Sequence, residues 1–178
     1  MRKITLSLVL LIYILMIVPV FSEEYQDLED YKYYVEMSES TLQEYIDINS
    51  DIYKKLLSDS LNLKELNQDQ VDKYKKQVDR LIDVANECIG WTMDRITVSA
   101  TIAYGGIDNA VENDQWVLLM TACEETYTTQ IDKLSLAKEG LTSSINDALE
   151  DKRINSNEAV AIMTNLHEID MVLALTSD

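Results

Sequence analysis

Proline and glycine are scarce in this chain of 178 residues. Its only proline is Pro19, and its four glycines are Gly90, Gly105, Gly106 and Gly140. Because proline breaks helices and tight β-turns usually need glycine, this scarcity argues against a fold of many short strands. It favours long, uninterrupted helices.

Histidine and cysteine are equally rare. The chain has one histidine, His167, and two cysteines, Cys88 and Cys123. No second histidine exists to complete a zinc site, and no serine-centred nucleophile motif accompanies His167. We therefore expect no catalytic, cofactor-binding or metal-binding residues, and we predict that the protein is not an enzyme.

Basic residues are outnumbered. The chain has 15 lysines and arginines against 32 aspartates and glutamates, which gives a formal net charge of −17 at pH 7. This charge argues strongly against nucleic-acid binding, which needs a positive surface, and disfavours docking on anionic lipid. It is compatible with a basic partner, with a weakly held cation such as Ca²⁺, or simply with high solubility.

One acidic stretch can be aligned with an EF-hand calcium loop. Position 6 of such a loop is glycine, but the residue aligned there is Lys152, so the pattern favours an ordinary junction between two helices. The residues aligned with ligand positions 1, 5, 9 and 12 are Asp147, Asp151, Asn155 and Glu158.

The N-terminus has the pattern of a secretory signal. A basic pair at residues 2–3 precedes an apolar run over residues 4–18, and Val20 and Ser22 suit the −3 and −1 positions of a cleavage site. The run is shorter than the roughly 20 residues that a membrane-spanning helix needs. An uncleaved anchor is the alternative interpretation.

This pattern divides the chain into two predicted parts. We predict a signal peptide over residues 1–22 and a single secreted, extracellular domain over residues 23–178. Cleavage would leave a domain with net charge −19 and no stable membrane insertion. Secretion would also expose both cysteines to an oxidising compartment.

The first part of the predicted domain, residues 23–58, follows a coiled-coil-like heptad and is expected to be a long amphipathic helix. It is rich in tyrosine, and Asn49 interrupts its apolar row. These features suggest a partner face, whereas the alternatives are that the rings cover the bundle seam and that Asn49 is a tolerated polar residue near the surface. The candidate partner face consists of Tyr31, Tyr45, Asn49 and Tyr53.

Two capping boxes mark later helices. Asn67 with Gln70 predicts the start of a helix that runs to about Ala103, and Asn155 with Glu158 predicts the start of a shorter final helix. Between them, a helix of about 40 residues is expected to end near residue 149. Its predicted cap is Asp108 or Asn109, and Gly140 is predicted to kink or interrupt it.

The glycine pair Gly105 and Gly106 is predicted to end the second helix and form a hairpin turn. Cys88 lies 17 residues before the pair and Cys123 lies 17 residues after it. Two antiparallel helices that meet at this turn would place both cysteines at the same height, about 26 Å away at 1.5 Å per residue. We therefore predict a Cys88–Cys123 disulfide rather than a redox-active pair, which is usually closer in sequence.

These elements predict an all-α fold. Three long helices and one short helix with short connections favour an elongated up-down-up-down bundle of antiparallel helices, braced by the cross-helix disulfide.

The stretch from Cys123 to Tyr127, followed by Leu134 and Ala137, resembles a helix motif of secreted plant inhibitors of invertase and pectin methylesterase. That family consists of four-helix bundles with disulfides. The present chain lacks the family's N-terminal cysteine pair, and Cys88 precedes the motif rather than following it. We assign no family from this resemblance.

The sequence therefore predicts a secreted, acidic, non-enzymatic helical bundle that binds a protein partner, as an interaction protein or an inhibitor. The alternative is an extracellular carrier that holds a small apolar ligand between its helices. Met93, Met120 and Met163 could line the cavity of such a carrier, although ordinary core packing also accounts for them.

Overall fold

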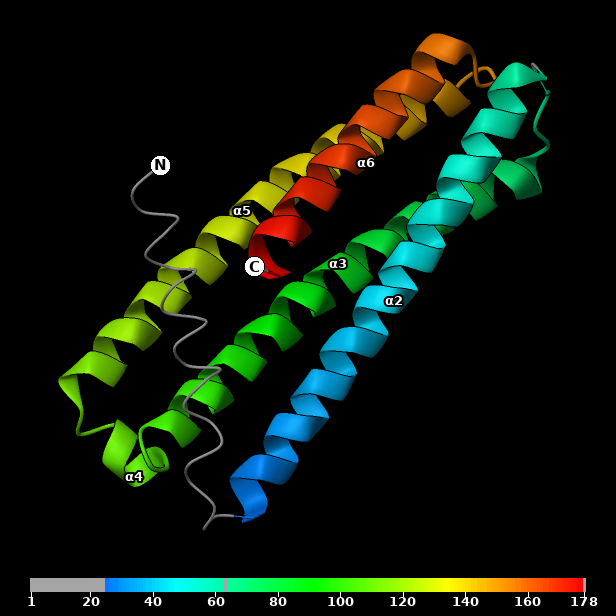
Figure 1. Ribbon diagram of the computed structural model, residues 1–178. Helices are drawn as coiled ribbons and strands as arrows, with labels where there is room; N and C mark the ends of the chain where they lie inside the picture. The colour runs from blue at the N-terminus through cyan, green and yellow to red at the C-terminus, as the bar shows by residue number, and fades with distance from the viewer. Residues whose placement is uncertain (1–24, 63, 178) are drawn as a thin grey trace. The chain divides into compact units, whose positions relative to one another are not determined.

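The computed structural model describes residues 25–62 and 64–177, which form five helices and no strand (Figure 1). The predicted all-α bundle is confirmed. The predicted signal peptide lies outside the described residues. The helices are α2 (Tyr25–Leu61), α3 (Gln68–Ala103), α4 (Ile107–Ala110), α5 (Asp114–Leu149) and α6 (Ser156–Ser177).

The described residues form two compact units, and α2, α3 and α5 each contribute residues to both. Unit 1 contains residues 25–39 and Gly90–Thr128, which include the first part of α2, the end of α3, α4 and the first part of α5. Unit 2 contains Ser40–Ile89 and Thr129–Ser177, and α6 lies entirely within it.

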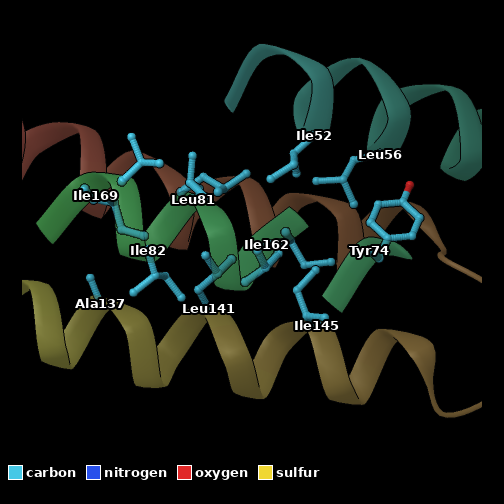
Figure 2. Close-up of a cluster of buried hydrophobic side chains, with 14 of the residues drawn as sticks. Ile52, Leu56, Tyr74, Leu81, Ile82, Ala137, Leu141, Ile145, Ile162 and Ile169 are labelled. Atoms are coloured by element: carbon cyan, nitrogen blue, oxygen red, sulfur yellow. The ribbon is translucent and has the colours of Figure 1, made fainter. Parts of the chain in front are cut away.

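Unit 2 is a four-helix bundle with a continuous core of aliphatic side chains. Each of its four helical segments turns an apolar stripe inward, as the three- and four-residue spacing of Leu, Ile and Val requires. Figure 2 shows the middle of this core, where α2, α3, α5 and α6 all contribute side chains. Residues with no exposed surface there include Ile52, Leu56, Leu81, Leu141, Ile162, Leu166 and Ile169.

The α2–α3 and α5–α6 connections meet at one end of unit 2. The Leu66 N–H donates to the Lys152 carbonyl at 2.8 Å, and the Arg153 guanidinium lies 3.0 Å from a carboxylate oxygen of Glu65. Helices α2 and α5 therefore end where α3 and α6 begin, so successive helices of unit 2 run antiparallel.

Both predicted capping boxes are confirmed. Asn67 and Gln70 exchange two hydrogen bonds of 3.0 Å, each between a backbone N–H and the other's side-chain oxygen. Asn155 and Glu158 do the same at 2.8 and 3.1 Å. Each box satisfies backbone donors that the first turn of a helix would otherwise leave unpaired.

Gly105 and Gly106 end α3, because glycine adopts backbone conformations with positive φ at little cost. Both have positive φ, and the Gly106 N–H donates to the Thr101 carbonyl while the Gly105 N–H donates to the Ile102 carbonyl. This pair of bonds is a Schellman motif, which needs a left-handed residue after the helix.

The prediction of the next helix start was wrong. Neither Asp108 nor Asn109 caps it, because the short helix α4 follows the glycines directly. The cap of α5 is Asn113, whose side-chain oxygen accepts from the Gln115 N–H at 2.9 Å. Gly140 does not interrupt α5.

The predicted disulfide is also absent, because Cys88 and Cys123 are both free. The disulfide was predicted from the equal spacing of the two cysteines from the glycine pair, which assumes that the turn consists of these two glycines alone. With α4 included in the connection, Cys88 lies 15 residues before the end of α3 and Cys123 only nine residues after the start of α5. At 1.5 Å per residue, these offsets differ by about 9 Å along the helices.

Candidate binding face

Unit 1 buries almost none of its large apolar side chains. Among residues 28–39 and 90–128, the only buried hydrophobic residues are Ala100 and Ala110, and no residue from Val111 to Thr129 is buried. Small polar residues, Ser38, Thr92 and Ser99, hold other buried positions. We call the half-buried side chains around them the unit 1 face: Tyr31, Tyr34, Val35, Met37, Trp91, Met93, Ile96, Val98, Ile102, Trp116, Leu119, Met120 and Cys123.

Aromatic rings gather on the α2–α3 side of unit 1. The Trp91 ring lies 5.9 Å, centroid to centroid, from both Tyr33 and Tyr34, and those two tyrosines are 5.5 Å apart. Edge contacts of this kind add a modest attraction to apolar burial. Tyr33 nevertheless remains 51% exposed, so this aromatic cluster presents surface to solvent.

On α5, the half-buried residues Trp116, Leu119, Met120 and Cys123 have the spacing of one helix face. The buried indole N–H of Trp116 has no hydrogen-bond acceptor among the described residues. A buried donor without a partner is uncommon in native proteins. Four buried side-chain atoms without a partner also occur in unit 2, in Asn49, Lys55, Gln77 and Gln130, so this feature does not distinguish the two units.

Charge also separates the two units. Among the described residues, unit 1 has 11 acidic residues and only two basic ones, Lys32 and Arg95. Unit 2 has 18 acidic and 11 basic residues. The partly buried apolar side chains of unit 1 therefore lie among described residues that carry almost no positive charge.

The candidate partner residues from the heptad analysis lie elsewhere. Tyr45 is 3% exposed and donates its hydroxyl to Asp170 Oδ1 at 2.7 Å, and Asn49 donates its amide to the same oxygen at 2.8 Å. These contacts join α2 to α6 inside unit 2. Asn49 is thus buried rather than at the helix surface, and its amide links α2 to α6.

Tyr53 makes a third contact of this type. Its hydroxyl donates to the Met163 carbonyl of α6 at 3.0 Å. Of the four residues proposed as a partner face, only Tyr31 belongs to unit 1, where it is half-buried. Whether any of these four residues contacts a partner stays a prediction. The sequence analysis did not include Tyr33 and Trp91 in the candidate face. A sequence pattern of aromatic residues does not reveal which side of a helix stays exposed to solvent in the folded protein.

Burial sets the ionisation of the two buried tyrosines of unit 2. Desolvation, followed by the hydrogen bond to Asp170, raises the pKa of Tyr45 well above its usual value. Desolvation and the 2.8 Å bond to Asp59 raise the pKa of Tyr74 in the same way. The Lys55 ammonium lies 3.5 Å from the centroid of the Tyr74 ring, and burial lowers its pKa. These groups form internal contacts of the bundle.

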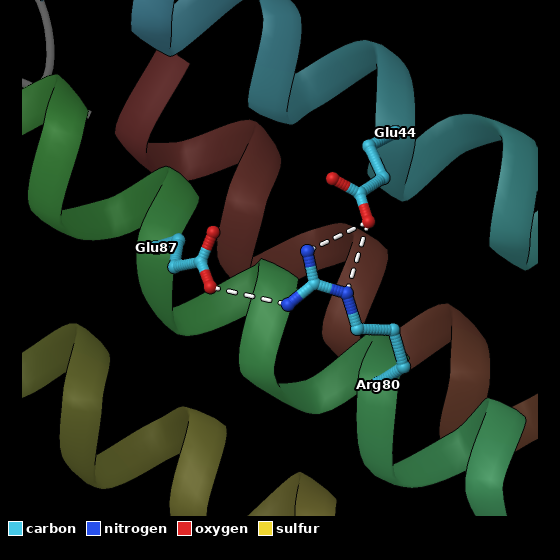
Figure 3. A network of polar contacts seen from close by, with 3 residues as sticks. All are labelled: Glu44, Arg80 and Glu87. Carbon is cyan, nitrogen blue, oxygen red and sulfur yellow. Dashed lines mark hydrogen bonds and ion pairs between the residues drawn. The ribbon is translucent and has the colours of Figure 1, made fainter.

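The surface between α2 and α3 in unit 2 carries an ion-pair network (Figure 3). Arg80 donates to Glu44 at 2.7 and 2.9 Å and to Glu87 at 3.3 Å. All three side chains are close to half exposed, so the network contributes little stability. Beside it is a hollow of about 250 Å³ lined by Asp47, Ile48, Asp51, Lys73, Lys76, Gln77 and Arg80.

The remaining sequence candidates do not converge on one site. His167 is exposed on α6, and the EF-hand-like stretch forms the end of α5, a turn and the Asn155 cap. No cluster of metal ligands occurs among residues 25–62 and 64–177. Met93 and Met120 belong to unit 1 whereas Met163 packs against the core of unit 2.

Comparison with known proteins provides no relative. No family model, no curated protein and no solved structure matches this chain. Within the part of the chain that the structure describes, no helix is long and apolar enough to cross a membrane.

Proposed function

We propose that this chain is a secreted, non-enzymatic protein that acts by binding a protein partner, and that unit 1 carries the contact. The observation that supports this proposal is the packing of unit 1, where large apolar and aromatic side chains such as Trp91, Ile96 and Met120 are only partly buried, whereas unit 2 has a core of fully buried ones. Apolar side chains that keep part of their surface exposed can form an interaction site where they lie together. Aromatic residues and methionine are also enriched at protein interfaces.

The carrier alternative has weaker support. A carrier needs an enclosed apolar cavity of roughly 300 Å³ or more. The hollow beside Arg80 has about 250 Å³ and is lined mainly by charged side chains. The three methionines proposed to line a carrier cavity are divided between the two units.

Two leucines on α5 provide a matched test. Leu118 in unit 1 is 70% exposed and Leu136 in unit 2 is 69% exposed. A photoreactive leucine analogue placed at each position in turn should capture a protein partner in the native extracellular fluid from position 118 but not from position 136. Equal capture at both positions would contradict a unit 1 contact. Native mass spectrometry that detects a co-purified apolar molecule would favour the carrier instead.

Secretion is tested separately. The chain with its N-terminal segment should appear in the medium of expressing cells with Glu23 as its first residue. A protein that stays in the membrane fraction and begins at Met1 would favour the uncleaved anchor.

A further inference from the structure

We propose that the unit 1 face binds a basic amphipathic helix of a partner protein. This inference rests on the proposed function and specifies the chemistry of the partner. It combines two independent features of the described residues of unit 1: a partly buried apolar face formed by three long helices and α4 without a further long helix, and a charge that is almost entirely negative.

The geometry favours a helix as the occupant. In unit 2, α6 lies against α2, α3 and α5 and buries their apolar stripes. Unit 1 contains segments of the same three helices but no part of α6. A partner helix on this face would complete a four-helix arrangement and remove side chains such as Ile96, Leu119 and Met120 from water. Amphipathic helices bind apolar helical surfaces through residues spaced three and four apart.

Methionine and aromatic residues suit such a contact. Met93 and Met120 are flexible and polarisable, so they can adapt to the side chains of an incoming helix. Trp91 and Trp116 are both partly exposed, and their large rings can contribute apolar contact area. The proportion of such residues on the unit 1 face contrasts with the Leu, Ile and Val core of unit 2.

Charge decides which helix would bind. The described part of unit 1 carries eleven acidic and two basic residues, so lysine or arginine beside the apolar stripe of a partner would be attracted. The same charges oppose a second copy of this chain, because two such units would repel each other. A basic partner helix is therefore preferred over self-association.

The two tryptophans of the chain are both in unit 1, which makes intrinsic fluorescence a local probe. The probes are an 18-residue amphipathic Leu/Lys peptide, a Leu/Glu peptide of the same pattern, and a scrambled Leu/Lys peptide. We expect only the first to shift tryptophan emission, with an affinity at least about tenfold higher than that of the Leu/Glu peptide. Raising NaCl from about 50 to about 500 mM should weaken it several-fold.

Matched variants locate the contact. Met120→Gln in unit 1 should weaken peptide binding about fivefold, whereas Met163→Gln, at a half-buried position of unit 2, should leave it unchanged. Replacing Asp94 and Glu124 by their amides should weaken binding and reduce its dependence on salt. The unit 2 control replaces Asp132 and Glu168.

Three results would overturn the inference. Equal binding of the Leu/Glu and Leu/Lys peptides would refute the basic partner while leaving unit 1 as an interaction surface. No emission shift with any peptide, together with partner capture at position 118, would refute a helical ligand but not the proposed function. Sedimentation that shows a dimer lost on Met120→Gln would assign the face to a second copy of the chain.

Discussion

Unit 1 and unit 2 are built from the same three long helices, yet only unit 2 has a core of large aliphatic side chains. In unit 2 the fourth helix, α6, closes the bundle. In unit 1 small residues such as Ser99 and Ala100 hold the inner positions, and larger side chains around them remain half-exposed. An amphipathic stripe therefore predicts a helix, but only a neighbouring element determines whether the stripe is buried.

The two units also differ in threonines whose hydroxyl groups bond to the helix backbone. Thr97, Thr101, Thr121, Thr126 and Thr128 of unit 1 each donate a hydroxyl to the carbonyl four residues earlier. Such bonds occupy a carbonyl of the helix and slightly weaken or bend it. Unit 1 thus combines weaker helix-forming residues with incomplete packing, and we expect it to open more readily than unit 2.

The largest contrast is expected from two leucines of α5. Leu141 in unit 2 has no exposed surface, whereas Leu119 in unit 1 is half-buried. Leu141→Ala should lower the free energy of unfolding by about 3 kcal/mol, because it leaves a cavity in a closed core, and Leu119→Ala by about 1 kcal/mol or less. Urea denaturation followed by circular dichroism measures both. Equal losses would show that unit 1 is packed as tightly as unit 2.

Alkaline pH should act on unit 2 through Tyr45. Its folded-state pKa is raised above the unfolded value of about 10, so its stabilising contribution is complete below pH 10 and falls as the pH rises further. The fall is about 1.4 kcal/mol per pH unit. Tyr45→Phe should reduce the slope of unfolding free energy between about pH 10 and 11.5 by this amount. An unchanged slope in the variant would refute the burial of this hydroxyl.

The reaction rates of the two free cysteines allow the two units to be compared. Burial raises the pKa of the Cys88 thiol in unit 2 to about 12, and Cys123 in unit 1 is half-buried with a raised pKa. Because the thiolate is the reactive form, iodoacetamide at pH 8 should label Cys123 at least about tenfold faster than Cys88. Both should react in the unreduced, denatured protein. If neither cysteine reacted, the result would support the predicted disulfide instead.

The smallest contrast is expected from two helical glycines. A Cβ added at Gly90 in unit 1 would meet nothing within 4 Å, so Gly90→Ala should stabilise the protein by about 0.5–1 kcal/mol. A Cβ at Gly140 in unit 2 would lie 2.5 Å from Asn165 Oδ1, and moving that side chain weakens its bond to Ser144. Gly140→Ala should therefore give no gain in melting temperature. Equal gains would contradict close contact of α5 and α6 at Gly140.

Much of the secondary structure was predictable because its signals are local. The capping boxes at Asn67 and Asn155 act within four residues, and the ends of α3 and α5 were placed correctly at Ala103 and Leu149. The Asn113 cap and α4 were missed because several polar residues follow Gly106 and any of them could begin a helix. That small error displaced the turn and invalidated the disulfide argument.

The candidate binding face was not predictable from the sequence, although its residues are visible there. Periodicity identified the apolar stripes of α2, α3 and α5, but the stripes continue from unit 2 into unit 1 without a break. The sequence by itself determined which residues form helices, because helix formation depends on neighbours within a few positions. Only the tertiary structure decided that Asp170 accepts from Asn49, 121 residues away, and that α6 packs within unit 2. Burial depends on contacts between distant segments, and an amphipathic pattern does not specify them.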